Sequence, residues 1–188
     1  MTAKRAFDLV LAALLTIVLL APMLLIALVV KMTSKGPVLY WSDRVGIHNR
    51  IFRMPKFRTM RKNTPAVATH LLENPDEYLT PAGSFLRRLS LDELPQLWSI
   101  VKGDMSFVGP RPALYNQDDL IHLRTLKGVH EILPGITGWA QVNGRDDIPI
   151  LKKVEYDSYY LAKKSFFFDL KILYRTAQKV MKAEGVRH

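Results

Sequence analysis

The sequence has 188 residues, a formal net charge of +10 and no cysteine. This length suits one domain, and the absence of thiols excludes a disulfide framework and a thiolate metal site or nucleophile. The basic excess favours anionic partners, namely nucleotide phosphates, acidic lipid headgroups or nucleic acid. The histidines are scattered along the chain, without the close pairing of a zinc site.

Residues 9–30 form an uncharged, almost wholly apolar run that is long enough, as a helix, to cross a bilayer. The run is too long for the apolar part of a signal peptide, and no small-x-small cleavage site follows it. Pro22 lies inside it and predicts a bend between two segments that are each too short to span a bilayer alone. A kinked spanning helix and a bent, re-entrant helix are the two alternatives.

Basic residues flank both ends of this run, so the distribution of charge favours no orientation across a membrane: Lys4, Arg5, Lys31 and Lys35. This is the pattern expected when both ends stay on the cytoplasmic face. Asp8 stands at the start of the run, and an ionisable group at that depth predicts a polar partner or an interfacial position.

The next segment, residues 36–60, predicts a loose β-hairpin. Extended runs at 38–41 and 51–59 flank a polar turn around 46–49. Pro55 predicts that the second strand lies at a sheet edge or is broken. Most cations here suit solvent or acidic lipids, but Lys56 and Arg58 share one face of an extended strand and are candidates to bind one phosphate together.

The adjacent pair Asp92–Glu93 is the centre of the stretch 90–112. The spacing Ser90-x-x-Glu93 is that of a capping box, which predicts a helix that begins after Ser90 and stops at Gly103. Carboxylates in a first helical turn are explained by capping and dipole compensation alone. They also suit an acidic pair that holds Mg²⁺ against a phosphate while one carboxylate acts as nucleophile. The local pattern leaves both interpretations open.

A short helix is predicted just upstream, with Thr80 as its N-cap and Pro81 at its first position. It reaches Leu89 and brings Arg87 and Arg88 beside the acidic pair, where they serve either as salt-bridge partners or as phosphate ligands. Turn signals predict that residues 63–78 form a surface excursion around another short helix.

In the second half of the chain, residues 114–126 predict an amphipathic helix that ends at Gly128. Residues 134–145 are glycine-rich, with too little apolar periodicity for a helix. They predict either a structured surface loop with several turns or a loop whose glycines admit a ligand and whose Arg145 meets the charge of that ligand. This loop is neither a phosphate loop nor a dinucleotide fingerprint. Helices at 150–164 and 166–183 complete the chain. The phenylalanines that open the last helix suit either the core or a membrane interface.

Six segments carry a resemblance to a known family. They are KRAFDLVLA, GPVLYWSDRVG, FRMPKFRTM, LRRLSLDELPQLWSIVKGDMSFVGPRP, PGITGWAQVNGR and VEYDSYYLAKKSFFFDLKIL, and together they cover nearly the whole chain. The chain resembles the small monotopic phosphoglycosyl transferases, bacterial enzymes that move a sugar phosphate from a nucleotide sugar onto a polyprenyl phosphate. The family often has Ser-Pro at the membrane bend, where this chain has Ala21-Pro22, and the proline before Lys56 is a second departure.

The resemblance implies an α+β fold, mostly helical with a small β-hairpin. It implies a re-entrant, proline-bent membrane helix over residues 1–35 and a cytosolic catalytic domain over residues 36–188, whose C-terminal amphipathic helices lie at the interface. The implied location is the cytoplasmic face of a bacterial inner membrane.

The family's Asp-Glu pair maps onto Asp92 and Glu93. By resemblance, Asp92 attacks the β-phosphorus of a nucleotide sugar, taken as a UDP-sugar, and releases UMP. Polyprenyl (undecaprenyl) phosphate then takes the sugar phosphate from the aspartate. Mg²⁺ next to Asp92 is implied to neutralise the diphosphate. The implied phosphate contacts are Arg111, Arg88, Arg145 and Lys56, and the implied membrane bend and anchor are Pro22, Lys4 and Arg5.

The implied partners are the nucleotide-sugar donor, the polyprenyl phosphate acceptor and membrane phospholipids. No nucleic-acid partner is expected, because the basic residues form no recognised binding module. Self-association stays open, and the sequence identifies neither the sugar nor the glycan pathway. Two other functions also explain part of the sequence, namely a non-enzymatic adaptor for acidic lipids and a membrane-bound phosphoesterase that passes the phosphosugar to water.

Overall fold

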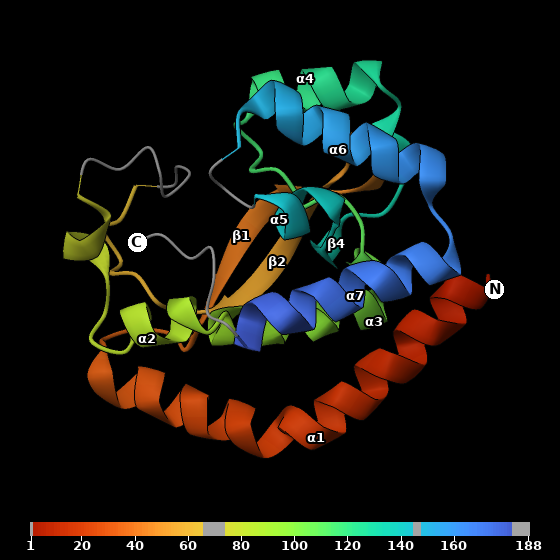
Figure 1. Ribbon diagram of the computed structural model, residues 1–188. Helices are drawn as coiled ribbons and strands as arrows, with labels where there is room; N and C mark the ends of the chain where they lie inside the picture. The colour runs from red at the N-terminus through yellow and green to blue at the C-terminus, as the bar shows by residue number, and fades with distance from the viewer. Residues whose placement is uncertain (1, 66–73, 145–147, 182–188) are drawn as a thin grey trace.

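The computed structural model describes residues 2–65, 74–144 and 148–181 (Figure 1). Helix α1 (Ala3–Thr33) runs along the base of the molecule, and the other elements form a domain above it. The excursion predicted for residues 63–78 lies partly outside the described residues. Its described parts are residues 63–65 and 74–78, and the latter contain the 3₁₀ turn η3 (Pro75–Tyr78).

Helix α1 continues through Pro22 and is bent in its middle part (Figure 1). The proline has no backbone N–H to donate and its ring clashes with the preceding turn, which is the usual cause of such a bend. At the start of the helix, the Thr2 hydroxyl accepts a hydrogen bond from the Arg5 amide. The predicted bend is therefore confirmed. Within the described residues, α1 is the one helix that is long and apolar enough to cross a membrane.

The predicted hairpin is confirmed. Strands β1 (Leu39–Val45) and β2 (Ile51–Phe57) pair antiparallel around the short 3₁₀ turn η1 (Ile47–Asn49). The first strand runs on to Val45 instead of ending at Trp41. Pro55 lies opposite Trp41 without breaking β2, which is tolerated because β2 is an edge strand of a two-stranded sheet.

A second sheet pairs β3 (Ser106–Val108) in parallel with β4 (Gly135–Thr137). The two segments of main chain approach so closely that a Cβ atom on Gly135 would lie 2.1 Å from the Gly109 nitrogen. The helix α5 (Trp139–Asn143) follows directly. The prediction of a loop without helix at 134–145 is therefore wrong, because elements of three to five residues are too short to show a hydrophobic period.

The helices predicted in the second half are confirmed, with shifted ends. They are α4 (Asp118–Leu126), α6 (Ile150–Lys163) and α7 (Phe166–Met181). Helix α4 begins later than predicted because Leu114 forms a β-bridge with Arg44. Gly128 turns the chain after α4 with φ of +71°. Helices α4 and α6 lie side by side in the upper part of the molecule (Figure 1). Helix α7 lies lower and contacts α5, β3 and β4, whereas α3 (Leu97–Lys102) contacts α1.

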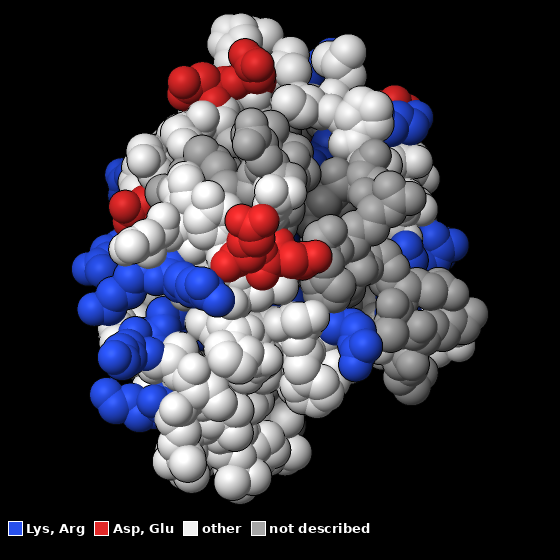
Figure 2. Space-filling model, turned by 90° about the vertical axis from the view of Figure 1, so that its left-hand side faces the viewer, with Lys and Arg blue, Asp and Glu red and all other residues white. Residues whose placement is uncertain are grey.

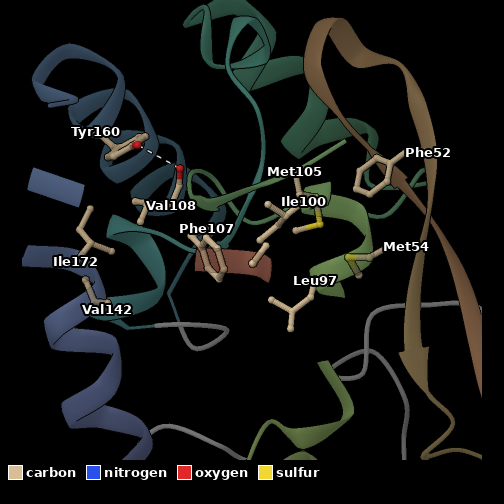
Figure 3. Packing of buried hydrophobic residues seen from close by; sticks show 11 residues of the cluster. Phe52, Met54, Leu97, Ile100, Met105, Phe107, Val108, Val142, Tyr160 and Ile172 are labelled. Carbon is tan, nitrogen blue, oxygen red and sulfur yellow. Dashed lines mark hydrogen bonds between the residues drawn. The ribbon is translucent and has the colours of Figure 1, made fainter. Parts of the chain in front are cut away.

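The largest core cluster joins the lower elements to the hairpin (Figure 3). Ile100, Met105 and Ile172 are fully buried at its centre. Phe52 and Met54 reach it from β2, and Ala12 reaches it from α1. Burial of each of the larger of these side chains contributes about 1.5–3 kcal/mol, so this cluster fixes the segment that leads from α3 into β3 against the hairpin.

Both ends of α1 are hydrogen-bonded to the same domain. At the N-terminal end, Arg5 donates to the carbonyls of Ile100 and Val101, which end helix α3, at 2.6 and 3.0 Å. At the C-terminal end, Arg58 donates to the Ser34 carbonyl and hydroxyl at 2.9 and 2.8 Å. The two ends therefore return to one body of the protein.

Two further contacts fix the N-terminal end of α1. Lys4 forms an ion pair with Asp169 of α7, and Asp8 accepts a hydrogen bond from the Phe107 amide at 3.3 Å. The polar partner expected for Asp8 is thus a backbone amide of β3. Lys4 and Arg5, expected as membrane anchors, contact the domain itself.

Large apolar side chains are exposed on α1 and also on α2 (Gly83–Arg88), α3 and α7. Phe167 of α7 is the most exposed of these side chains at 81%. The others on α2, α3 and α7 are Phe85, Trp98, Val101, Phe166, Leu170, Tyr174 and Val180. Figure 2 shows the base of the molecule as a protrusion without charged side chains, with Lys and Arg side chains on the flank above it.

Candidate active site

The acidic pair lies in a 3₁₀ segment, not in the first turn of an α-helix. This segment, η4 (Leu91–Gln96), follows Ser90, whose backbone is left-handed with φ of +56°. The Ser90 side chain makes no cap hydrogen bond, so the predicted capping box is wrong. The α-helical turns begin only at Leu97, and Gly103 ends them with φ of +99°, as predicted. Pro95 lies inside the 3₁₀ segment and has no backbone N–H to donate.

Glu93 is held by two cations. Lys56 Nζ lies 2.7 Å and Arg111 Nη2 lies 2.9 Å from the same oxygen, Glu93 Oε1. Burial favours the neutral acid, but the charges and hydrogen bonds of Arg111 and Lys56 outweigh it and hold the pKa of Glu93 well below its usual value. Glu93 is therefore a carboxylate, and it fixes the two cations at the site.

The surroundings of Asp92 differ from those of Glu93. Its side chain is buried, with 7% of the residue exposed. In the part of the chain that the structure describes, it accepts no hydrogen bond. Burial raises the pKa of Asp92; the charge of Lys56 opposes that rise, and Glu93 adds to it. The neighbouring carboxylates are thus divided, since Glu93 is bound to cations while the oxygens of Asp92 remain available.

The predicted phosphate-binding cations differ in how closely they approach the acidic pair. Lys56 and Arg111 reach the acidic pair directly. Of the two arginines on α2, the charge of Arg87 lowers the pKa of Asp92, whereas Arg88 is exposed and forms no ion pair with the described residues. Arg145 lies outside the described residues.

Arg58 does not share a ligand with Lys56. Strand β2 ends at Phe57, and the Arg58 side chain is buried against the end of α1, where it donates to Ser34 and to the Pro37 carbonyl. The predicted joint phosphate grip of Lys56 and Arg58 is therefore wrong. Thr80 is not an N-cap either, because α2 begins at Gly83 and the Thr80 hydroxyl donates to the Thr59 carbonyl.

Some residues around the site gave no signal in the sequence. Arg124 of α4 and Asp157 of α6 form a buried ion pair at 2.7 Å, and Arg124 also donates to the Arg111 carbonyl at 2.8 Å. Their spacing along the chain matches no motif, because the contact exists only when α4 packs against α6. The Pro-Arg-Pro motif at 110–112 was visible in the sequence, but its contact with Arg124 was not.

The donor set fits a magnesium ion that is shared with substrate. Among the described residues no group of three or more His, Asp or Glu side chains could enclose a metal ion. Mg²⁺ does not need such a cage, because it often binds through one or two carboxylates together with substrate phosphates and water. Asp92 has oxygens free of hydrogen bonds from the described residues, whereas the cations on Glu93 already occupy Oε1.

The apolar, bent helix α1 suggests an association with a membrane, and the acidic pair is buried beside Lys56 and Arg111. The sequence profile described as "Bacterial sugar transferase" matches residues 1–183. The chain belongs to the bacterial sugar transferase family, and the resemblance drawn from its motifs is confirmed.

Similar proteins cover the chain almost completely. The "Uncharacterized sugar transferase EpsL" of Bacillus subtilis is 44% identical over 190 residues, which cover 100% of this chain and 91% of that protein. The "Exopolysaccharide production protein ExoY" of Rhizobium meliloti is 38% identical over 205 residues, covering 97% of this chain and 87% of that protein.

A third relative has a more specific name. The "UDP-glucose:undecaprenyl-phosphate glucose-1-phosphate transferase" of Escherichia coli K12 is 41% identical over 186 residues, which cover 94% of this chain. The match spans only 39% of that protein's length. This chain therefore corresponds to one part of the longer relative.

Proposed function

We propose that this protein transfers a sugar 1-phosphate from a UDP-sugar to undecaprenyl phosphate, through a phosphosugar intermediate on Asp92. The names of relatives such as the Escherichia coli enzyme supply the two substrates. The observation that carries the mechanism is the division of the acidic pair: Glu93 is bound to Lys56 and Arg111, and Asp92 is buried with its oxygens available.

The proposed reaction has two steps. An Asp92 carboxylate oxygen attacks the β-phosphorus of the UDP-sugar, the bond from that phosphorus to the bridging oxygen breaks, and UMP leaves with the electron pair. A phosphate oxygen of undecaprenyl phosphate then attacks the same phosphorus and restores the Asp92 carboxylate. The product is undecaprenyl diphosphate sugar, which serves as a first membrane-bound intermediate of glycan assembly. An acyl phosphate is reactive enough to divide one transfer into two easier steps.

The cations of the site stabilise the negative charge of the phosphates. Lys56 and Arg111 are fixed by Glu93 before substrate binds, so their reorganisation costs little during reaction. Asp92 is the residue that would hold Mg²⁺, which would neutralise the diphosphate and improve UMP as a leaving group. Arg87, and Arg88 at the exposed end of α2, are further candidates for phosphate contacts, as is Arg145 by resemblance.

The same proposal includes a membrane geometry. The membrane segment of the proposed division, residues 1–35, contains α1 and dips into one leaflet and returns, so that residues 36–188 stay on the cytoplasmic face of the bacterial inner membrane. Two observations support it, namely the bend at Pro22 and the hydrogen bonds that tie both ends of α1 to one domain. A helix that crossed the bilayer would leave its ends about 30 Å apart on opposite faces. The exposed aromatic side chains of α3 and α7 would rest at the interface, where the lipid acceptor meets the donor.

The direct test is release of UMP from a panel of UDP-sugars by the purified protein, with undecaprenyl phosphate and Mg²⁺. We expect release that requires the lipid and the metal, that is lost with EDTA, and that is lost in Asp92→Asn. Asp118→Asn changes an exposed carboxylate of α4 and should leave the activity unchanged. UMP release without consumption of lipid would indicate hydrolysis. The absence of release from every sugar, with the protein folded and membrane-bound, would favour a lipid-binding adaptor.

A further inference from the structure

We propose that Arg124 and Asp157 act as a positioning pair, which holds the main chain at Arg111 and thereby sets the Arg111 guanidinium against Glu93. This inference rests on the proposed function for the role of Arg111 toward substrate. Neither residue touches the acidic pair, so their effect on the reaction passes through Arg111.

The pair itself is buried and well oriented. Arg124 donates from Nε and Nη2 to Asp157 Oδ2 at 3.0 and 2.7 Å. The two residues are 7% and 1% exposed. A buried ion pair of this kind is seldom needed for stability, because well-packed apolar residues of similar volume often serve as well or better. Its presence calls for another explanation.

The third nitrogen of the Arg124 guanidinium, Nη1, supplies that explanation. Arg124 Nη1 donates to the main-chain carbonyl of Arg111 at 2.8 Å. The side chain of that same residue reaches Glu93 Oε1 at 2.9 Å. Asp157 orients the guanidinium of Arg124, and Arg124 in turn fixes the backbone from which the Arg111 guanidinium extends.

The chain around Arg111 depends on such contacts. Pro110 and Pro112 have no backbone N–H, so this segment is held largely through its carbonyl groups. The Pro110 carbonyl accepts from the Gly135 amide at 2.9 Å, and the Pro112 carbonyl accepts from Arg44 Nη1 at 3.2 Å. The carbonyl between them, that of Arg111, is held by Arg124. Loss of this hydrogen bond frees the middle of the segment while its two neighbours stay attached.

A shift of the Arg111 main chain matters because a side chain that contacts a phosphate has to be positioned accurately for the reaction. A displacement of about 1 Å, caused by a change away from the reacting atoms, can lower the rate up to roughly 100-fold. The pair therefore couples the packing of α4 against α6 to the geometry of the site.

The test compares the loss of the pair with its replacement by apolar residues. Arg124→Met leaves Asp157 buried without its partner and should lower both the Tm and kcat/KM. In Arg124→Met/Asp157→Leu the buried charges are gone, so the Tm should return toward the wild-type value. Because the Arg111 carbonyl still lacks its donor, kcat/KM for the UDP-sugar should stay roughly 10-fold to 100-fold low. The loss should appear in the same kinetic parameter, KM or kcat, as in Arg111→Met.

The matched control is Val154→Ala, which loosens the packing of α6 against Leu120 of α4 without touching the hydrogen bond to Arg111. It should lower the Tm and leave kcat/KM near the wild-type value. A wild-type kcat/KM in the apolar double variant would overturn the inference, because the pair would then serve stability alone.

If the wild-type protein turns over no UDP-sugar, the proposed function is refuted but the positioning role of Arg124 and Asp157 is not. A second measurement tests that role without any turnover. The fall in Tm caused by Arg111→Met is measured in the wild-type background and in the Arg124→Met/Asp157→Leu background. A smaller fall in the second background supports the inference, since the contact of Arg111 with Glu93 is then already weakened. Equal falls in the two backgrounds would overturn it.

Discussion

Lys56 Nζ lies 2.7 Å from Glu93 Oε1, and the two side chains reach each other from β2 and η4, elements that are 37 residues apart at this contact. Burial lowers the pKa of Lys56, and the charges of Glu93 and Asp92 oppose that shift. Through this contact Glu93 is bound to a cation, whereas the oxygens of Asp92 accept no hydrogen bond from the described residues.

The Asp92→Asn change should abolish transfer and preserve the fold. We expect UMP release to fall roughly 10³-fold or more, as for removal of a catalytic nucleophile. The Tm should be unchanged or rise by up to about 4 °C, because burial disfavours the charged carboxylate that the amide replaces. Kinetics and differential scanning fluorimetry on the same preparation test both parts. Normal turnover by this variant would contradict the assignment of Asp92 as the nucleophile.

Glu93→Gln should reveal the stabilising role of Glu93 through its dependence on pH. The native state holds the pKa of Glu93 well below the ordinary value of 4.5, so its stabilising effect is complete above that pH. The effect is lost as the pH falls through the lower pKa of the folded state. We therefore expect a Tm deficit of roughly 5–10 °C that is constant from pH 7 to about pH 5 and narrows below about pH 4.5.

The control for this comparison is Glu131→Gln, an exposed carboxylate of the short turn η5 (Val129–Glu131). Its Tm should follow the wild-type value across the same range. A deficit in Glu93→Gln that grows as the pH falls would contradict the assignment of Glu93 as an ion-paired carboxylate.

Pro22→Leu should let part of the population straighten α1 across the bilayer. The chain contains no cysteine, so Ala3→Cys gives a single label site at the exposed start of α1. In intact cells, a membrane-impermeant maleimide should reach this thiol in Pro22→Leu but not in the parent. Permeabilised cells should label in both. A thiol in the parent that reacts from outside the cell would refute the re-entrant geometry.

Phe167→Asp should weaken membrane retention without unfolding the protein. Phe167 is 81% exposed on α7, so the change removes little packing, but a carboxylate resists transfer into the membrane interface. Salt extraction of membranes and flotation with vesicles measure the effect. Leu151→Asp is the matched control, because Leu151 is 72% exposed on α6, away from α1 (Figure 1). Equal release of both variants would argue against α7 as an interfacial helix.

Long and strongly periodic elements were predictable from the sequence. The bent apolar helix, the hairpin and the two C-terminal helices appear where periodicity and turn residues placed them. The acidic pair, its upstream arginines and the stop at Gly103 were equally visible, because each depends on neighbouring residues. The parallel pair of β3 and β4 was not, since its strands have three residues each and are stabilised by partners distant in the chain.

The sequence by itself determined that this chain has an apolar anchor with a proline bend and a site with two adjacent carboxylates among cations. Only the tertiary structure decided how those charges are allocated. Glu93, not Asp92, binds Lys56 and Arg111 because of the way β2 meets η4. Arg58 binds the end of α1 instead of the acidic pair because β2 ends beside that helix. A side-chain charge is encoded locally, but its pKa and its partner follow from burial and distance, which arise when remote segments pack together.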